Sequence, residues 1–306
     1  MKIVIIGAGA LGAYFGSRLE EVGENVTYLV REKRAAQIRK YRLKVSSPTG
    51  NYQSLNPQII ESPTEVAHVD LVILAVKGQH LQGALEPLKM FVEKGAKVLP
   101  LLNGIEHIPI LQNKLGEEVV LGGLSFIIAT LSDEGHVIHS SEFHDLIFGP
   151  LHPSQIEFCQ QLDVIMEAAN FHNVLSDDIS FKMWEKYMFI SSFSGITTAT
   201  NLPIGPIREQ LETFSIAKNL LKELKQLANE YGVYLSDVHV EEAVEKFRLL
   251  NEETTSSMHQ DRRKGLTLEV DHLHGGALRL AKEKELQLPY TETILAMIKP
   301  FEKNRG

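Results

Sequence analysis

The sequence has a single cysteine, Cys159, among its 306 residues. One cysteine cannot form an intramolecular disulfide framework, and it cannot supply a cysteine-based zinc site. We expect Cys159 to lie on a helix as a small apolar residue. Because this composition suits a reducing compartment, we expect the protein to be cytoplasmic.

Long apolar runs and an excess of positive charge are also missing. No stretch approaches the ~18–20 apolar residues that a membrane span requires. The first apolar run breaks at Gly7 and continues into a patterned helix, which a signal peptide does not do. The formal net charge is -8, which disfavours a general binder of nucleic acid or anionic membranes. We therefore expect neither nucleic acid nor membrane as a partner.

The first half of the chain has the pattern of an α/β domain. A strand at 2–6, a helix at 10–22 and a strand at 25–30 make a βαβ unit of about the usual ~30 residues. Turn residues without a helix separate the later strands, which predicts an antiparallel extension. The further elements that we expect are a hairpin at 42–55, strands at 70–76 and 96–103, a helix at 81–93, three strands within 118–148 and a helix at 154–170.

The second half has only helical periodicity. Because 306 residues exceed what one core usually holds, we predict two domains, residues 1–175 and 176–306. Ser236 and Thr254 are suited to helix N-caps, and Gly232 to a helix end. The helices that we expect span about 177–199, 207–232, 236–251, 255–264, 267–284 and 289–303.

Three glycines follow the first strand with the spacing Gly7-x-Gly9-x-x-Gly12. The first permits a tight turn, the second lets a pyrophosphate approach the backbone, and the third lets the helix pack on the strand. The helix N-terminus supplies free N–H groups and the positive end of a dipole. In this βαβ context the motif predicts a Rossmann-type dinucleotide-binding domain. We expect the cofactor to contact Gly7, Ala8, Gly9, Ala10, Leu11 and Gly12.

The residues after the second strand bear on which dinucleotide binds. NAD-binding units usually place a carboxylate there for the adenosine ribose, but this chain has Arg31. A guanidinium can hold a 2′-phosphate with two hydrogen bonds, whereas a carboxylate would repel it. Arg31 therefore indicates NADPH. The alternative is NAD, with Glu32 as the ribose partner and Arg31 in a solvated charge run.

Polar residues also follow two later strands. Lys77 comes after the strand at 70–76, and Asn103 follows the strand at 96–103. The carboxyl ends of strands in an open α/β sheet face the ligand crevice, so both side chains could reach the cofactor. The alternative is a surface lysine and an Asn-Gly turn.

Two stretches of the helical half carry further candidates. Lys186 lies in a mostly apolar helix, where a lysine is either a snorkelling surface residue or an acid with a depressed pKa. In "SSMHQDRRKGLTLE", the helix start at Ser257 suits a carboxylate ligand, with plain capping as the alternative; Glu269 closes the stretch. We expect no metal site, because His272 and His274 are two residues apart on a helix and do not share a face.

Taken together, these motifs resemble the 2-dehydropantoate 2-reductase (ketopantoate reductase) family over essentially the whole chain. The matching features are the N-terminal glycine motif, Arg31, Lys77 after "LAV", the Asn-Gly pair, the W-x-K helix and "SSM-x-QD" with its later Glu. Members of this family reduce a 2-keto acid with NADPH, and ketopantoate reduction feeds pantothenate and coenzyme A synthesis.

The resemblance implies a role for each matching residue. It makes Lys186 the general acid and Glu269 the partner of the substrate hydroxyl or carbonyl, with a contact to the cofactor. It assigns Ser257 to the substrate carboxylate, Asn103 to both cofactor and substrate, and Lys77 to the cofactor. The oligomeric state is left open, a homodimer included.

The chain departs from the family pattern where the family usually carries asparagines after the catalytic lysine. Ile190, Ser194 and Ile204 occupy those positions, and of these only the Ser194 side chain can still bind substrate through a hydrogen bond. Three functions are therefore carried forward: a ketopantoate reductase, a paralogous NADPH-dependent reductase of another 2-keto acid, and a non-catalytic NADP-binding redox sensor.

Overall fold

The computed structural model describes residues 1–302, and the chain in it forms two compact units. Unit 1 comprises Met1–Leu102 and His107–Ile179, and unit 2 comprises Asn103–Glu106 and the residues from Ser180 onward. The short segment Asn103–Glu106 thus belongs to the second unit although it follows a strand of the first. No sequence pattern assigns this segment to unit 2.

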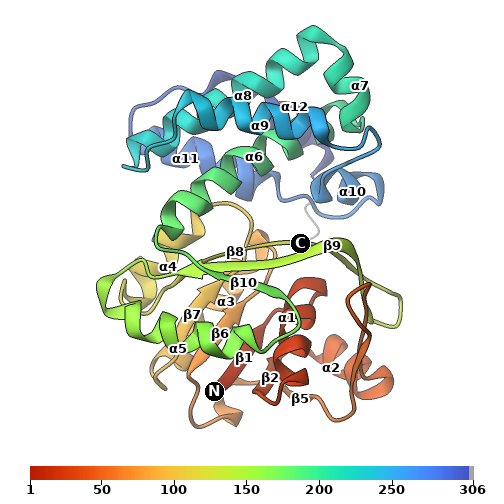
Figure 1. Ribbon diagram of the computed structural model, residues 1–306, viewed down its shortest axis with the longest axis vertical. Helices are drawn as coiled ribbons and strands as arrows, with labels where there is room; N and C mark the ends of the chain where they lie inside the picture. Colours follow the sequence, from red (N-terminus) through yellow and green to blue (C-terminus); the bar gives the residue numbers. More distant parts are fainter. Residues whose placement is uncertain (303–306) are drawn as a thin grey trace. The chain divides into compact units, whose positions relative to one another are not determined.

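A parallel sheet forms the centre of unit 1, with strand order β5-β2-β1-β6-β7 (Figure 1). Because successive side chains of β1 point to opposite faces, Ile3 and Ile5 pack with α1 and α5, whereas Val4 and Ile6 pack with α3 and α4. Both faces are therefore covered, which is the usual arrangement of a parallel sheet. The elements of this sheet and its helices are β1 (Lys2–Ile6), α1 (Ala10–Glu21), β2 (Asn25–Leu29), α2 (Glu32–Tyr41), β5 (Gln58–Ile60), η1 (Pro63–Glu65), β6 (Leu71–Leu74), η2 (Gly78–His80), α3 (Leu81–Val92), β7 (Lys97–Pro100) and α4 (His107–Leu115).

A second sheet completes unit 1, with the order β10-β9-β3-β4 and β8 paired to β9. The β8–β9 and β3–β4 pairs are antiparallel, while β9 pairs in parallel with β3 and β10. The α/β fold with an antiparallel extension is thereby confirmed, although the extension also contains parallel pairs. Its elements are β3 (Leu43–Ser46), β4 (Tyr52–Ser54), β8 (Gly122–Leu131), β9 (Val137–Gly149), η3 (Pro153–Gln155), α5 (Ile156–Glu167) and β10 (His172–Leu175).

Strand β9 corrects one expectation, since the sequence predicts two strands over its length. The polar residues around His139 and Ser141 predict a break between two strands, yet both side chains are buried. His139 Nδ1 lies 2.8 Å from Ser47 Oγ, and Ser141 Oγ donates to the Phe143 carbonyl at 2.6 Å. Because these polar groups are satisfied inside the sheet, the strand continues without a turn, although its pairing with β8 is irregular between the pairs Ile127–His144 and Ala129–His139.

Unit 2 is helical, which confirms the predicted change of architecture. Its central helix α6 has an unbroken run of buried residues at 191–198, as expected of a helix surrounded by others. Buried hydroxyls on it bond back to the preceding turn, for example Thr197 Oγ1 to the Phe193 carbonyl at 2.7 Å. The elements are α6 (Ile179–Thr200), α7 (Ile204–Glu209), α8 (Leu211–Glu230), α9 (Asp237–Leu249), α10 (Ser257–Arg263), η4 (Asp271–Gly275), α11 (Gly276–Glu283), α12 (Pro289–Ile298) and η5 (Lys299–Phe301).

Two details of the helical half differ from the sequence prediction. The single helix expected at 207–232 is two helices, because the backbone of Gln210 is extended and separates α7 from α8. Thr254 is not an N-cap. Ser256 caps α10 instead, its Oγ accepting a hydrogen bond from the His259 N–H, while the Thr254 carbonyl accepts one from the Ile204 N–H. The helix expected at 289–303 is α12 followed by η5, and residue 303 lies outside the described residues.

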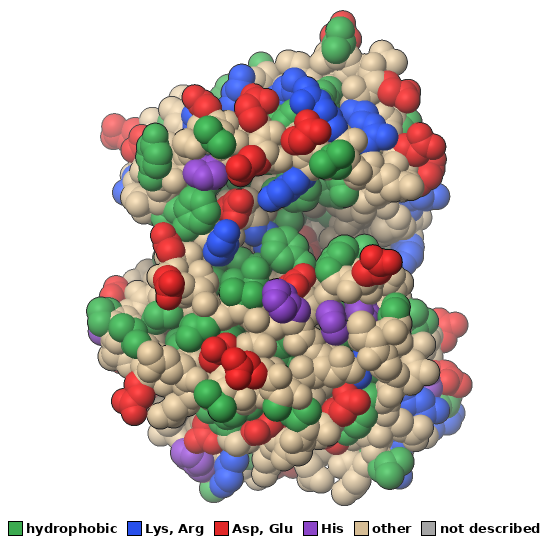
Figure 2. Space-filling view, in the orientation of Figure 1, with side chains coloured by type: hydrophobic (Ala, Val, Ile, Leu, Met, Phe, Trp, Pro, Cys, Tyr) green, Lys and Arg blue, Asp and Glu red, His purple; other side chains and the backbone are tan. Residues whose placement is uncertain are grey.

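Cys159 is buried on α5, as the sequence predicts. Acidic and basic side chains are interspersed over the face drawn in Figure 2, in keeping with 31 Lys and Arg against 39 Asp and Glu. Within residues 1–302, none of the helices combines the length and the apolar character that crossing a membrane demands.

Candidate functional site

Unit 1 contains a pocket of about 710 Å³ at the carboxyl edge of its parallel sheet. Residues that follow three neighbouring strands line it: Gly7 and Gly9 after β1, Arg31 and Arg34 after β2, and Lys77 after β6. Ligands of open α/β sheets bind at this edge. The sequence-predicted cofactor residues Gly7, Ala8, Gly9, Arg31 and Lys77 are therefore gathered around one cavity.

The glycine turn has the geometry that a close phosphate contact requires. Gly7 has a φ of +94°, and a Cβ there would stand 2.7 Å from the Ala75 carbonyl oxygen, so only glycine fits. A Cβ at Gly12 would stand 2.9 Å from Ile5, so this glycine lets α1 pack onto β1. At Gly9, by contrast, no described atom lies within 4 Å of a Cβ position. The N-terminus of α1 thus faces open space, with no acidic residue in its first turn.

Arg34 is a pocket residue that the sequence did not single out. Its Nε donates to the Ala8 carbonyl of the glycine turn at 2.9 Å, and its Nη1 donates to Gln37. Its Nη2 is buried and has no hydrogen-bond partner among residues 1–302. Burial lowers the pKa of this guanidinium, yet it stays charged near neutral pH. A cation with an unused donor beside a phosphate-type turn fits an anionic ligand.

Arg31 has a different environment from Arg34. It is the N-cap residue of α2, its side chain is exposed, and it lines the pocket together with Glu32. Both of the groups weighed for the ribose end are thus present at the cavity. Lys77 is also exposed and precedes η2. Arg34 could have been proposed as a second cofactor residue from the "REKR" run. Its hydrogen bond to Ala8, however, depends on the fold.

In unit 2, Lys186 and Asn103 form a second candidate group. Lys186 lies on α6 and its Nζ donates to Asn103 Oδ1 at 3.3 Å. Burial lowers the pKa of Lys186 to about 8, and the nearby carboxylate of Glu269 opposes this shift. The ammonium is therefore poised to release its proton close to neutral pH, which suits a general acid. This environment favours the depressed-pKa interpretation over the snorkelling one.

The other predicted substrate residues of unit 2 lie in differing environments. Ser194 is buried and Ile190 is partly buried, and both follow Lys186 at intervals of one helical turn on α6. Ser257 is the exposed first residue of α10, and Glu269 lies two residues before the start of η4. Ile204 is fully buried in the helical half.

Comparison with known proteins places this geometry in context. Residues 3–153 match the model of the family described as Ketopantoate reductase PanE/ApbA, and residues 178–302 match its C-terminal model. The chain is 34% identical over 305 residues to the uncharacterized oxidoreductase YkpB of Bacillus subtilis, with 100% of each chain covered. It is 28% identical over 310 residues to a 2-dehydropantoate 2-reductase of Pyrococcus abyssi, covering 100% of this chain and 99% of the other.

A solved structure has the same fold over the whole chain. The crystal structure of 2-dehydropantoate 2-reductase from Geobacter metallireducens superimposes with a TM-score of 0.89 at 26% identity. The match covers 98% of this chain and 99% of the other. Both units described above are therefore included in the likeness.

Proposed function

Because the chain belongs to the ketopantoate reductase PanE/ApbA family of oxidoreductases, we propose that it reduces a 2-keto acid with NADPH. 2-Dehydropantoate is the substrate that we favour, with pantoate as the product for pantothenate and coenzyme A synthesis. The observation that carries the proposal is Lys186, whose ammonium donates to Asn103 and whose pKa is lowered by burial to about 8.

The residues of the unit 1 pocket fit a phosphorylated dinucleotide. The open space at Gly9 and the N–H groups of α1 suit the pyrophosphate. The buried Nη2 of Arg34, which has no hydrogen-bond partner among residues 1–302, could donate to the cofactor. Arg31 lines the same pocket and is the residue proposed for a 2′-phosphate, and Lys77 adds a third positive charge to those of Arg31 and Arg34. When bound, the nicotinamide would supply the hydride for reduction at carbon 2 of the keto acid.

In the proposed mechanism Lys186 neutralises the negative charge that develops on the substrate oxygen. Reduction of a ketone leaves alkoxide character on that oxygen, and an ammonium within hydrogen-bond reach both stabilises and protonates it. Asn103 holds the Lys186 Nζ through its Oδ1. Glu269 keeps the lysine charged, because its carboxylate raises the pKa that burial lowers. Ser194 and Ser257 are the hydroxyls proposed for the substrate carboxylate and hydroxyl.

A substrate panel tests this function. The rate of NADPH oxidation would be measured with 2-dehydropantoate and with 2-keto acids that lack its 4-hydroxyl, and each assay repeated with NADH. We expect turnover of at least one 2-keto acid, faster with NADPH than with NADH. NADPH binding without turnover of any member of the panel would favour the redox sensor.

A second candidate is a reductase of another, more apolar 2-keto acid. It is favoured by Ile190, which stands partly buried one turn after Lys186 on α6 and offers no hydrogen bond from its side chain. An apolar wall at this position would suit a substrate side chain without a hydroxyl. The two candidates differ in what Ile190 does.

Replacement of Ile190 by asparagine separates the two candidates. If 2-dehydropantoate is the substrate, Ile190→Asn should raise its kcat/KM by ~5–150-fold, since a missing hydrogen bond to a buried polar group costs roughly 1–3 kcal/mol. Ile190→Leu, which keeps the position apolar, is the control and should change kcat/KM little. A fall in 2-dehydropantoate turnover in Ile190→Asn, with a wild-type preference for acids lacking the 4-hydroxyl, would establish the second candidate.

A further inference from the structure

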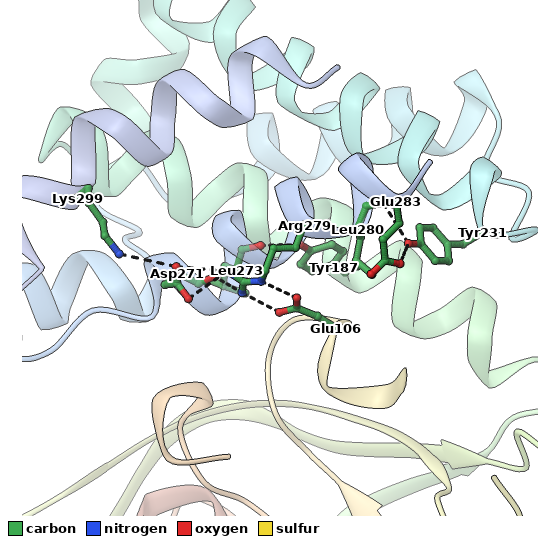
Figure 3. Close-up of polar contacts among 9 residues, drawn as sticks. All are labelled: Glu106, Tyr187, Tyr231, Asp271, Leu273, Arg279, Leu280, Glu283 and Lys299. Carbon is green, nitrogen blue, oxygen red and sulfur yellow. Dashed lines mark hydrogen bonds and ion pairs between the residues drawn. The ribbon is translucent and has the colours of Figure 1, made fainter. Parts of the chain in front are cut away.

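The segment Asn103–Glu106 is fastened to unit 2 by an arginine–carboxylate pair. Arg279 of α11 donates from Nε to Glu106 Oε1 at 2.6 Å and from its second terminal nitrogen to Glu106 Oε2 at 2.8 Å (Figure 3). Two parallel hydrogen bonds of this kind fix direction as well as distance. The Glu106 side chain is 14% exposed and that of Arg279 is 48% exposed, so the carboxylate is shielded from solvent while the guanidinium is partly open to it.

Two consecutive glycines leave the space that this pair occupies. A Cβ at Gly276 would stand 3.1 Å from Glu106 Oε2, and a Cβ at Gly275 would stand 3.1 Å from the Nη1 of Arg279 and 2.7 Å from Asp271 Oδ1. Asp271 in turn lies 3.3 Å from Arg279 Nη1 (Figure 3). Side chains at 275 or 276 would therefore displace the groups that hold Glu106.

The other end of the segment is held by the same helical stretch, seven residues earlier. His272 Nε2 lies 2.5 Å from the Asn103 carbonyl oxygen, which it must approach as a donor. Gly104 has a φ of +94°, and a Cβ there would stand 3.0 Å from His272 Nε2. His272 lies in η4 and Arg279 in α11. These two consecutive elements therefore bind both ends of the segment.

The position of Asn103 has a direct consequence for Lys186. The Asn103 side chain accepts the Lys186 hydrogen bond, while its backbone carbonyl faces His272. The chain enters the segment from Leu102 and leaves it at His107, both of which belong to unit 1. The contacts to His272 and Arg279 therefore fasten this segment, and Asn103 with it, within unit 2.

We propose that Glu106 and Arg279 are positioning residues, whose ion pair anchors the Asn103–Glu106 segment to the helical unit and so holds the Asn103 amide against Lys186. This inference rests on the proposed function for the role of Lys186. In this proposal Arg279 and Glu106 act only through Asn103. The anchoring itself is a property of unit 2 and can be measured without turnover.

Arg279→Met tests the proposal in two independent ways. Backbone hydrogen exchange of the peptide covering residues 101–108 should accelerate by about tenfold or more, because a charge-assisted pair is lost. With the keto acid that the wild type turns over, kcat should fall by about 10- to 100-fold, the effect of a small misplacement of a catalytic group. The Kd for NADPH should stay within about twofold, since the glycine turn, Arg31 and Lys77 of unit 1 are unaltered.

Two controls make the test specific. Lys299 lies 3.7 Å from Asp271 at the outer end of the same network and does not contact Glu106 (Figure 3), so Lys299→Met should leave both readouts unchanged. The double variant Glu106→Gln/Arg279→Met should be no slower than Arg279→Met, because the two residues act as one pair. Additive losses would mean that Arg279 acts elsewhere.

The outcomes separate the anchoring from the function. Unchanged exchange at 101–108 in Arg279→Met overturns the proposal, and so does a kcat within about twofold of the wild type. If Arg279→Met lowers the Tm, the measurements are made on Arg279→Lys instead, because lysine keeps the charge but not the paired hydrogen bonds. A wild-type kcat in Arg279→Lys would again overturn the proposal. If the wild type turns over no 2-keto acid, the proposed function fails, while the exchange measurement still decides whether the pair anchors the segment.

Discussion

Replacement of Lys186 by alanine is expected to lower kcat by ~10²–10⁴-fold, the usual contribution of a positioned general acid. The variant loses the ammonium that would protonate the substrate oxygen, and it loses the donor to Asn103 Oδ1. The affinity for NADPH should change little, because Lys186 is not a proposed cofactor residue and the glycine turn, Arg31 and Lys77 lie in unit 1. Steady-state kinetics with the preferred keto acid, together with an NADPH binding titration, measure both quantities.

A matched control and a pH profile make this prediction specific. Lys182 lies one turn earlier on α6, is exposed, and pairs with Glu185 at 3.3 Å; Lys182→Ala should keep wild-type kcat. Because burial lowers the pKa of Lys186 to about 8, the ammonium is present below that pH and kcat for reduction should fall as the pH rises through it. Retention of more than about a tenth of kcat in Lys186→Ala would make Lys186 a snorkelling residue instead.

Replacement of Arg31 by alanine is expected to weaken NADPH binding by ~10–150-fold and to leave NADH binding nearly unchanged. The loss corresponds to ~1.5–3 kcal/mol, the scale of a hydrogen bond to a charged group, and only NADPH carries the 2′-phosphate. Fluorescence titration of the wild type and the variant with each cofactor measures the four affinities.

The neighbouring Lys33 serves as the control for Arg31. It is exposed and is not among the residues that line the pocket, so Lys33→Ala should bind NADPH as the wild type does. Equal affinity of the wild type for NADH and NADPH would contradict the cofactor assignment. Glu32, which also lines the pocket, would then be the residue to test as a ribose partner.

The sequence predicts the architecture well where the signal is local. Buried strands such as 71–74 and the amphipathic helix α3 are recognisable from short windows, and so is the change to helices after about residue 175. Helices α2 and α4 and the three-residue strand β5 are absent from the sequence prediction, although α2 consists largely of strong helix formers. The break between α7 and α8 at Gln210 was missed as well, because no proline or glycine marks it.

Prediction of the candidate site is limited by contacts between distant residues. Functional roles for Lys186, Asn103 and Arg31 could be proposed from their positions after strands or on an apolar helix. The hydrogen bond of Arg34 to Ala8 could not be predicted, because it depends on the fold. The binding of Asn103–Glu106 to unit 2 could not be predicted either, since His272 and Asn103 are 169 positions apart. The π-helical turn at Asp271–Gly275 has no sequence signal that we can identify. Such turns are frequent at functional sites.

The most direct test of the central claim follows the hydride itself. The protein would be incubated with NADPH deuterated at the transferable position of the nicotinamide and with the preferred 2-keto acid, and the product analysed by mass spectrometry. Hydride transfer predicts a 2-hydroxy acid that carries the deuterium at carbon 2, formed by the wild type and far more slowly by Lys186→Ala. A protein that binds NADPH tightly but forms no deuterated hydroxy acid from any 2-keto acid would contradict the proposed reductase and favour the redox sensor.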